Sequence, residues 1–478
     1  MKKTYFIEPF IDTGLGNSAY LVGSYDTKKG ILIDPLRDVD RYLHSASERG
    51  IQLTHVLDTH LHADFVSGNR EIAYQTGAVI GASAEAQLGF EHHPLTEESV
   101  IDVGAFQIRV MSTPGHAPEH ISFLIVEPDH KTPSALFSGG ALIVGGAART
   151  DLLSPELTHP LAHQLYHTIH GELLKLPDEL EVFPTHGSGS YCVAPVSSDR
   201  VTTIGRERKT NPLAKAQSEE EFIRHALTGL ASYPIYYKYL RDINQNGAKI
   251  LGEVPMLKSL SASEVKALMD EGVVVLDVRH GKVFATGHIP NSYGIRVDAP
   301  LTTWAGWLIP FGSRIVLVAE STDQTVAATR QLIRIGYDDL LGYLGGGIDA
   351  WARAGYPVEM IPSMNVKELH ERLNTVGADG RAEPPLRLVD VRQLSEWNEG
   401  HIPGAMHIEA GRIAWDDLPF AHDTPLAIQC ASGSRSMSVS SVLRRRGYHN
   451  VIQVEGGINK WKVNGFEITN ANTTFNIA

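Results

Sequence analysis

Residues 59–65 read Thr-His-Leu-His-Ala-Asp-Phe, and this stretch decides how the first half of the chain is interpreted. It directly follows Thr54-His-Val-Leu-Asp58, a β-type run. His60 and His62 flank a single leucine on the loop after that predicted strand, and Asp64 follows at the same alternation. Both imidazoles can therefore face one metal ion, and we predict a metal site at this strand end.

Two more histidines occupy similar positions farther along the chain. Thr113-Pro-Gly-His116 and Pro184-Thr-His186-Gly each place a histidine where a strand passes into a loop. Candidate ligands at three separate strand ends suit an α/β sandwich whose site lies at one edge of its sheets. The candidate metal ligands are His60, His62, Asp64, His116 and His186.

Length and composition limit the class of protein. At 478 residues the chain is too long for one core, since domains commonly have about 100–200 residues. A net charge of −13 argues against non-specific nucleic-acid binding, which needs a basic surface. No apolar run reaches about 18 residues, so no membrane-spanning helix is expected, and the first residues do not resemble a signal peptide. Cys192 and Cys430 are the two cysteines, which we interpret as free thiols of a cytoplasmic protein.

An internal repeat occupies the second half of the chain. Residues 276–292 match residues 389–405 without a gap, and Gly346-Gly-Ile-Asp-Ala-Trp351 matches Gly456-Gly-Ile-Asn-Lys-Trp461. In both copies strands alternate with helices, a pattern typical of a parallel sheet covered on both faces. The repeat is too long for a solenoid and indicates two tandem domains. We therefore predict three domains, at residues 1–255, 256–360 and 361–478.

The second copy carries a cysteine in a position suited to sulfur chemistry. Leu426-Ala-Ile-Gln429 is predicted to be a buried strand, Cys430-Ala-Ser-Gly-Ser-Arg435 follows, and a helix is predicted from Ser436 to Arg446. A cysteine that faces a helix N-terminus meets unpaired N–H groups and the positive end of the helix dipole. Arg435 adds a fixed charge. These surroundings favour a thiolate and would stabilise a persulfide anion.

The first copy lacks this cysteine. Counting back by the same number of residues from Gly336-Tyr337 and from Gly447-Tyr448 places Ala319 opposite Cys430. Alanine cannot carry sulfur, so we expect this copy to be silent in sulfur transfer. Its expected role is spacing, docking or dimer contact.

The second copy resembles the rhodanese (sulfurtransferase) family. The resemblance rests on Asp390, His401-Ile-Pro-Gly-Ala405, Cys430-x₄-Arg435 and the Gly456-to-Trp461 segment. Phosphatases have five residues between the cysteine and the arginine, and the shorter loop is similar to that of sulfane-sulfur carriers. The resemblance implies catalysis by Cys430 and Arg435 and binding of the transferred sulfur by the loop residues Ser432, Gly433 and Ser434.

The first domain resembles the metallo-β-lactamase superfamily, and within it the glyoxalase II and persulfide dioxygenase branch. Residues 59–64, 113–116, 145–151 and 185–190 carry this resemblance, which implies an αββα sandwich. Persulfide dioxygenases of this branch hold one Fe(II) at the positions of His60, His116 and Gly140. Here Gly140 stands in place of an aspartate and Phe65 in place of a histidine, so a dinuclear site is not expected.

Three outcomes for the metal site remain open from the residues alone. His60, His62 and His116 can hold the ion with water completing the shell, an arrangement that suits Zn²⁺ as readily as iron. Asp64 or Asp151 can replace the missing carboxylate. The site can also bind metal weakly or not at all.

Two other residues of the first domain are candidate substrate contacts. Cys192 comes shortly after His186, so it can accept sulfur or line the substrate channel, or it is a packed thiol. Arg149 belongs to the 145–151 stretch that carries the resemblance.

The order of the domains resembles that of bacterial persulfide dioxygenase–rhodanese fusions. The resemblance implies oxidation of a low-molecular-weight persulfide by O₂ to sulfite and thiol, followed by transfer of sulfane sulfur to or from sulfite through Cys430. The implied partners are glutathione or a similar thiol, sulfite, thiosulfate and O₂, with a homodimer as the suggested assembly. The implied cofactor is one divalent metal ion, Fe(II), with Zn(II) as the alternative.

Two other functions compete with this interpretation. One is a zinc hydrolase of thioesters similar to glyoxalase II, in which the metal activates a water molecule. The other is a non-catalytic first domain that binds or docks a persulfide carrier and leaves Cys430 to do the chemistry. Gly140 favours the second alternative, and the surviving set of ligands disfavours it.

Overall fold

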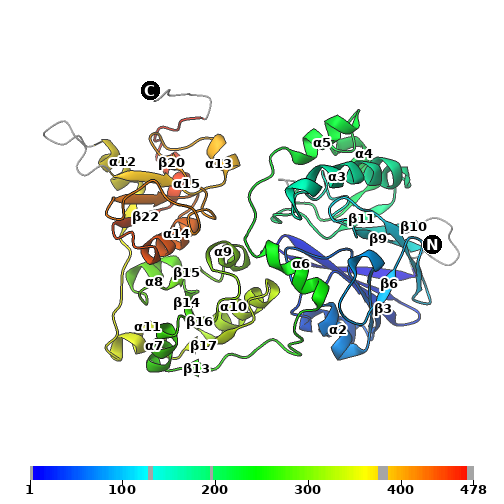
Figure 1. Ribbon diagram of the computed structural model, residues 1–478, viewed down its shortest axis with the longest axis horizontal. Helices are drawn as coiled ribbons and strands as arrows, with labels where there is room; N and C mark the ends of the chain where they lie inside the picture. The colour runs from blue at the N-terminus through cyan, green and yellow to red at the C-terminus, as the bar shows by residue number, and fades with distance from the viewer. Residues whose placement is uncertain (1–3, 127–132, 194–196, 375–385, 471–478) are drawn as a thin grey trace. The chain divides into compact units, whose positions relative to one another are not determined.

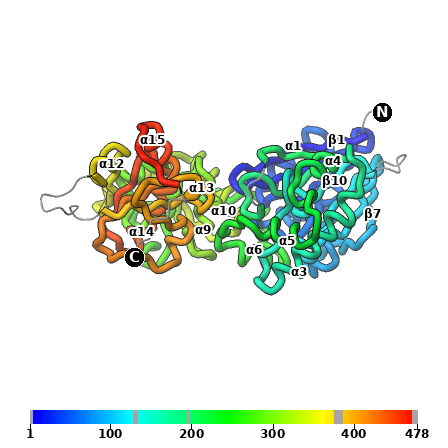
Figure 2. Tube along the Cα trace, turned by 90° about the horizontal axis from the view of Figure 1, so that it is seen from above, coloured from blue at the N-terminus to red at the C-terminus, as the bar shows by residue number. Residues whose placement is uncertain are grey.

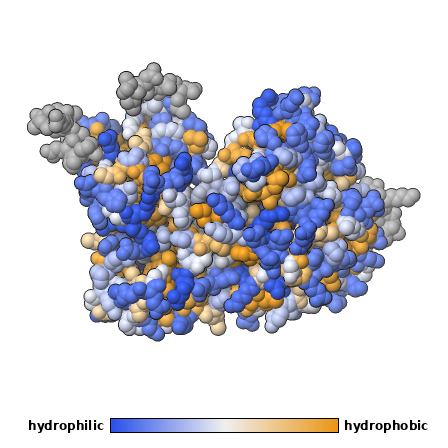
Figure 3. Space-filling view, in the orientation of Figure 1, coloured by the Kyte–Doolittle hydropathy of each residue, from blue (hydrophilic) through white to orange (hydrophobic). Residues whose placement is uncertain are grey.

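The chain forms two compact units in the computed structural model, which describes residues 4–126, 133–193, 197–374 and 386–470 (Figure 1). The first unit comprises Met1–Pro255 and Ile333–Gly336, and the second comprises Met256–Leu332 and Tyr337–Ala478. None of the helices in the described residues is long and apolar enough to cross a membrane. On the face drawn in Figure 3, hydrophilic and hydrophobic residues are interspersed over both units.

Two six-stranded sheets form the first unit, and each has its strands in sequence order. The first sheet contains β1 (Tyr5–Asp12), β2 (Asn17–Ser24), β3 (Lys29–Ile33), β4 (Gln52–Leu57), β5 (Val79–Ser83) and β6 (His93–Leu95). The second contains β7 (Val100–Asp102), β8 (Gln107–Ser112), β9 (Ile121–Val126), β10 (Pro133–Gly139), β11 (Glu181–Pro184) and β12 (Thr202–Thr203). Strands β3 to β6 run parallel, as do β10 and β11.

The two sheets pack face to face, and helices cover their outer faces. Tyr20 and Ile31 of the first sheet share one buried cluster with Phe123 and Phe137 of the second. The covering helices are α1 (Asp40–Glu48), α2 (Asn69–Thr76), α3 (Pro155–Tyr166), α4 (Ile204–Thr210), α5 (Glu219–Leu227) and α6 (Tyr237–Asn246). Helices α3 and α5 lie side by side in both views (Figures 1 and 2). This is the αββα sandwich expected from the sequence.

Two copies of one parallel sheet form the second unit. The strand order is β13-β17-β16-β14-β15 in the first copy and β18-β22-β21-β19-β20 in the second, so the two copies have the same topology. The first copy has β13 (Ser259–Leu260), β14 (Val274–Asp277), β15 (Tyr293–Gly294), β16 (Ile315–Val318) and β17 (Leu340–Leu344). The second has β18 (Ser363–Asn365), β19 (Arg387–Asp390), β20 (Met406–His407), β21 (Leu426–Gln429) and β22 (Val451–Glu455).

Helices flank both sheets of the second unit. Those of the first copy are α7 (Ala262–Asp270), α8 (Gly281–Thr286), α9 (Leu301–Leu308), α10 (Thr322–Arg334) and α11 (Gly347–Arg353). Those of the second are α12 (Val366–Asn374), α13 (Leu394–Asn398), α14 (Ser434–Arg445) and α15 (Gly457–Val463). The predicted fold class is confirmed in both units.

The repeated Asp-Val-Arg motif has a structural role in each copy. Arg279 and Asp277 are buried, and Arg279 donates to Asp277 at 2.6 Å and to the Gly287 carbonyl at 2.8 Å. Arg392 donates in the same way to Asp390 at 2.7 Å and to the Gly400 carbonyl at 2.8 Å. A buried charge needs a partner and hydrogen bonds, and these pairs join the end of one central strand to the loop after the next helix.

Candidate metal centre and sulfur-transfer loop

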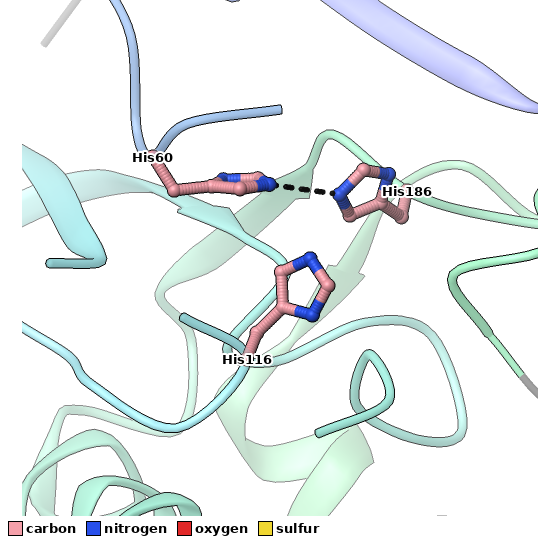
Figure 4. Close-up of side chains that lie close together, drawn as sticks. All are labelled: His60, His116 and His186. Carbon is pink, nitrogen blue, oxygen red and sulfur yellow. Dashed lines mark hydrogen bonds between the residues drawn. The ribbon is translucent and has the colours of Figure 1, made fainter. Parts of the chain in front are cut away.

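Three histidines from different parts of the first unit converge at one end of the sandwich (Figure 4). His60 follows β4, His116 follows β8, and His186 follows β11. One ring nitrogen of each lies within 4.8 Å of the others, and all three side chains are buried. The structure thus groups His186, and not His62, with His60 and His116.

Hydrogen bonds fix which nitrogen of each ring faces the centre. The Nδ1 of His116 donates to the Arg149 carbonyl at 2.7 Å. The Nδ1 of His60 lies 2.9 Å from the Thr59 hydroxyl, which gives its own proton to Asp34 and therefore accepts. The Nδ1 of His186 lies 3.1 Å from the Asn17 amide oxygen. With each Nδ1 protonated, every Nε2 presents a lone pair.

These three nitrogens fit a single metal ion. Burial lowers the pKa of His60 well below its ordinary value and that of His116 to about 3, so both rings are neutral. The Nε2 atoms of His60 and His186 are 3.3 Å apart. Two ligands of a tetrahedral ion with metal–nitrogen bonds of 2.0–2.1 Å lie about 3.3 Å apart. A cation between the two lone pairs would remove their repulsion.

The remaining candidate ligands, His62 and Asp64, are not part of this three-histidine group. The Nε2 of His62 lies 3.1 Å from the buried Asp34 carboxylate. Asp64 accepts from the Asn17 amide at 2.8 Å and lies 3.3 Å from His186 Nδ1. His62 and Asp64 form a second candidate group with His186. A carboxylate beside the outer nitrogen of a ligating histidine orients that ring, and Asp64 is placed to do this for His186.

His116 and Ala148 fill the space beside Gly140, the position where the resemblance implies an aspartate. A Cβ atom added to Gly140 would lie 2.7 Å from His116 Cδ2 and 2.9 Å from the Ala148 Cβ. The Gly140 N–H donates to the Nε2 of His120 at 3.0 Å. His120 is therefore a fourth buried histidine beside the centre, with its accepting nitrogen already occupied. Sequence reasoning missed it, although Thr113-Pro-Gly-His116 and His120 lie in one short loop.

A cavity of about 850 Å³ opens onto the metal centre. The lining includes His60 and His116 on one side and, on another, Tyr233 from the segment before α6 together with Tyr237, Lys238 and Arg241 of α6. The volume is in the range that accommodates a small organic ligand, about 300–1,000 Å³.

The predicted substrate contacts of the first domain do not line this cavity. Cys192 is fully buried, its Sγ lies 3.9 Å from the Tyr237 hydroxyl, and burial raises its pKa well above the ordinary value for a thiol. Arg149 pairs with Asp151 through two hydrogen bonds of 2.5 and 2.6 Å and stacks over Tyr233. Direct contact of Cys192 or Arg149 with substrate stays a prediction. Asp151 lines the cavity, but its carboxylate is held by Arg149.

An ion pair holds the metal loop against α6. The Glu119 carboxylate, which is buried, accepts from Arg241 at 2.8 and 2.7 Å and from the Leu61 N–H at 3.0 Å. Leu61 lies between the two histidines of the loop. Neither Glu119 nor Arg241 belongs to a motif, so only the fold reveals this contact.

Cys430 lies directly after β21, as predicted, at the start of a tight loop before α14. The Gly433 N–H donates to Cys430 Sγ at 3.1 Å, and the Ser436 hydroxyl lies 3.8 Å from the sulfur. Helix α14 begins at Ser434, earlier than predicted, because Gly433 adopts a φ of 102° at the N-cap. The Gly433 N–H is therefore placed to stabilise an anion on the sulfur, whereas the Ser436 hydroxyl donates its proton to the Gly433 carbonyl at 2.9 Å.

Arg435 is bound to a neighbouring helix. It donates to both oxygens of Glu396 in α13, at 2.5 and 2.6 Å. Its charge stays at the first turn of α14, next to the loop. In the first copy, Ala319 follows β16 at the position that Cys430 has after β21, which agrees with the predicted correspondence.

Comparisons with known proteins agree with this division of the chain. A family model described as the metallo-beta-lactamase superfamily matches residues 12–186, and one described as a rhodanese-like domain matches residues 261–354 and 365–464. Mouse mitochondrial persulfide dioxygenase ETHE1 is 30% identical over 213 residues, which cover 43% of this chain and 74% of that protein. The human protein is 29% identical over 205 residues, 42% of this chain and 72% of that protein.

One solved structure extends over much more of the chain. A crystal structure of a metallo-beta-lactamase from Staphylococcus aureus subsp. aureus COL has a TM-score of 0.66 and 30% sequence identity. The match covers 71% of this chain and 99% of that one. A hydroxyacylglutathione hydrolase-like protein of mouse is 32% identical over 170 residues, 36% of this chain and 57% of that protein.

Proposed function

This chain belongs to the metallo-β-lactamase superfamily and carries two rhodanese-like domains, and we propose that it oxidises persulfides in its first domain and transfers sulfane sulfur in its last. The observation that carries the proposal is the convergence of three oriented Nε2 lone pairs in a chain that also holds Cys430 in a loop whose Gly433 N–H donates to its sulfur. Similarity to persulfide dioxygenases supports the first activity, and the rhodanese-like match supports the second.

In the first domain, His60, His116 and His186 would hold one metal ion, Fe(II), with Zn(II) as the alternative. A bound Fe(II) ion would supply the redox chemistry by which O₂ is activated. The balanced reaction is RSS⁻ + O₂ + H₂O → RSH + HSO₃⁻, in which O₂ takes four electrons from the sulfane sulfur. Lys238 at the cavity wall would attract the anionic substrate, and Tyr233 would pack against its organic part.

In the last domain, Cys430 would carry the sulfane sulfur as a persulfide. Transfer to sulfite follows Cys-S-S⁻ + SO₃²⁻ → Cys-S⁻ + S₂O₃²⁻, with the electron pair of the broken S–S bond left on the thiolate. The Gly433 N–H and the first turn of α14 would stabilise both anions. We propose the cytoplasm as the location.

A second candidate function for the first domain is hydrolysis of a thioester. The similarity to a hydroxyacylglutathione hydrolase-like protein favours it, and a three-histidine shell suits zinc. This reaction consumes water and no O₂, so the two candidates differ in a measurable reactant.

The deciding experiment is oxygen uptake by the Fe(II)-loaded protein supplied with glutathione persulfide. We expect uptake matched one to one by sulfite. The variant His116→Ala should lose both the metal and the activity, because the shell then has two ligands. The matched control is His159→Ala, which removes an exposed histidine of the same cavity.

Absence of oxygen uptake by a protein that holds one iron per chain would contradict the dioxygenase. Hydrolysis of S-lactoylglutathione by the zinc-loaded protein would then identify the hydrolase.

A further inference from the structure

A second cavity, of about 610 Å³, lies in the second unit beside the Cys430 loop. Its lining includes Ser432, Gly433 and Ser434 of the loop. The same lining includes His280, Lys282 and Arg296, which belong to the copy without a cysteine. The silent copy thus forms part of the wall around the sulfur-carrying loop.

The lining is basic although the chain is acidic overall. The lining contains Arg279, Lys282 and Arg296 of the first copy and Lys367 and Lys460 of the second, against one lining carboxylate, Glu455. Arg279 and Arg296 are paired with Asp277 and Asp298, so the three lysines supply most of the unpaired positive charge. The chain as a whole has a net charge of −13. A concave surface with an excess of one charge concentrates ligands of the opposite charge, so this cavity favours anions.

Lys282 reaches across to the segment that supports the loop. Its Nζ lies 3.3 Å from Glu455 Oε2. Glu455 precedes Gly456 and Gly457, and the next N–H, that of Ile458, donates to the Cys430 carbonyl at 2.9 Å. The Lys282 side chain is 72% exposed, so its charge remains available to a ligand.

The two copies are held together next to this cavity. Helices α8 and α14 lie side by side (Figure 1), and Met437 of α14 belongs to one buried cluster with Phe284 and Ala285 of α8. The buried Gly294 N–H donates to the Ser441 hydroxyl at 3.0 Å. These contacts keep Lys282 and Arg296 of the silent copy in one cavity lining with residues 432–434 of the loop.

We propose that the silent copy supplies an anion-binding wall for the sulfur-transfer loop, and that Lys282 determines specificity for a thiol carrier bearing negative charges away from its sulfur. The cavity is far larger than sulfite or thiosulfate needs and matches a small organic ligand. The proposal rests on sulfur transfer by Cys430. The step is Cys-S-S⁻ + RSH → Cys-S⁻ + RSSH: the S–S bond to Cys430 breaks, a new S–S bond forms to the carrier, and the proton stays with the product.

The test compares acceptor thiols of different charge. The full-length protein is loaded with sulfur from thiosulfate, freed of sulfite, and mixed with mercaptosuccinate or with uncharged mercaptoethanol. We expect Lys282→Glu to lower the ratio of the two transfer rates, mercaptosuccinate over mercaptoethanol, about tenfold, which corresponds to about 1.4 kcal/mol. The matched control is Lys258→Glu, an exposed lysine of the same copy outside the cavity, which should keep the ratio.

Binding provides a readout that does not need transfer. The S-methyl derivative of mercaptosuccinate is titrated calorimetrically into the Cys430→Ser protein, with lysine or glutamate at position 282. About tenfold weaker binding with glutamate supports the proposal, and equal binding overturns it. Failure of thiosulfate to load Cys430 would contradict the proposed transferase, while the binding result would still decide the role of Lys282.

Discussion

At the scale of single residues, the metal centre is a histidine site from which a carboxylate is missing. The Nε2 atoms of His60 and His186 approach to 3.3 Å, and each outer nitrogen has an oxygen partner. Gly140, where related enzymes are expected to have an aspartate, is packed against His116 and Ala148. An aspartate side chain therefore has no room at position 140 unless the neighbouring atoms move.

Gly140→Asp is the variant that tests this packing. The new Cβ would lie 2.7 Å from the His116 ring, so either the ring or the strand end must move. Overpacking of this kind costs about 1–3 kcal/mol. We expect a lower melting temperature and less than one metal ion per chain by elemental analysis.

The control for this variant is Gly171→Asp, because a Cβ at Gly171 meets no atom within 4 Å. A Gly140→Asp protein as stable as the parent and with higher metal affinity would show that the aspartate position is still available.

At the scale of elements, α6 is joined to the metal loop of the first unit through Glu119. Arg241 of this helix is bonded to the buried Glu119, which also accepts from the Leu61 N–H. Glu119 would become a buried carboxylate without a counter-charge if Arg241 were removed, a loss that is costly in protein interiors. The helix therefore acts on the metal loop through one ion pair.

Arg241→Met should lower the free energy of unfolding by about 3 kcal/mol, measured by urea denaturation. Adding Glu119→Gln should recover part of this loss, because the buried charge is then removed as well. Lys238→Met, one turn earlier in the same helix and exposed, should change the stability by less than about 0.5 kcal/mol. Equal effects of the Arg241 and Lys238 variants would contradict a structural role for the ion pair.

At the scale of the whole molecule, the two proposed activities lie in different compact units, each with its own core. Residues 12–186 match one family and residues 261–464 contain two matches to another. In the proposed scheme, the sulfite made in the first domain is produced on the same chain as the Cys430 persulfide that donates sulfur to it, and such tethering raises the effective concentration of the two reactants. The chemistry of each unit should then be separable by single substitutions.

Cys430→Ser should abolish sulfur transfer from thiosulfate to cyanide and leave persulfide-dependent oxygen uptake in place. His116→Ala should do the reverse. Cys192→Ser should keep thiosulfate-to-cyanide transfer, because this thiol is buried in the first unit. Transfer activity that persists without Cys430 would show that another group carries the sulfur.

Local patterns allowed much of the fold and the site to be predicted. The strand at Leu426–Gln429 has the expected bounds, since its apolar run lies within the segment itself. The start of α14 was misplaced, because the N-cap depends on the left-handed conformation of Gly433. His120 was missed, because nothing in its surroundings in the sequence distinguishes it from an ordinary loop histidine.

The sequence by itself determined the two fold types, the repeat, the absence of a thiol from the first copy and the residue types available to a metal. These features depend on residues that are close together in the sequence. The tertiary structure alone decided that His186 and not His62 joins His60 and His116, that a side chain at Gly140 would meet His116, and that Lys282 of the silent copy lines one cavity with residues 432–434 of the Cys430 loop. Each of these depends on sheet register and helix packing between residues far apart in the chain, and no local pattern encodes such distances.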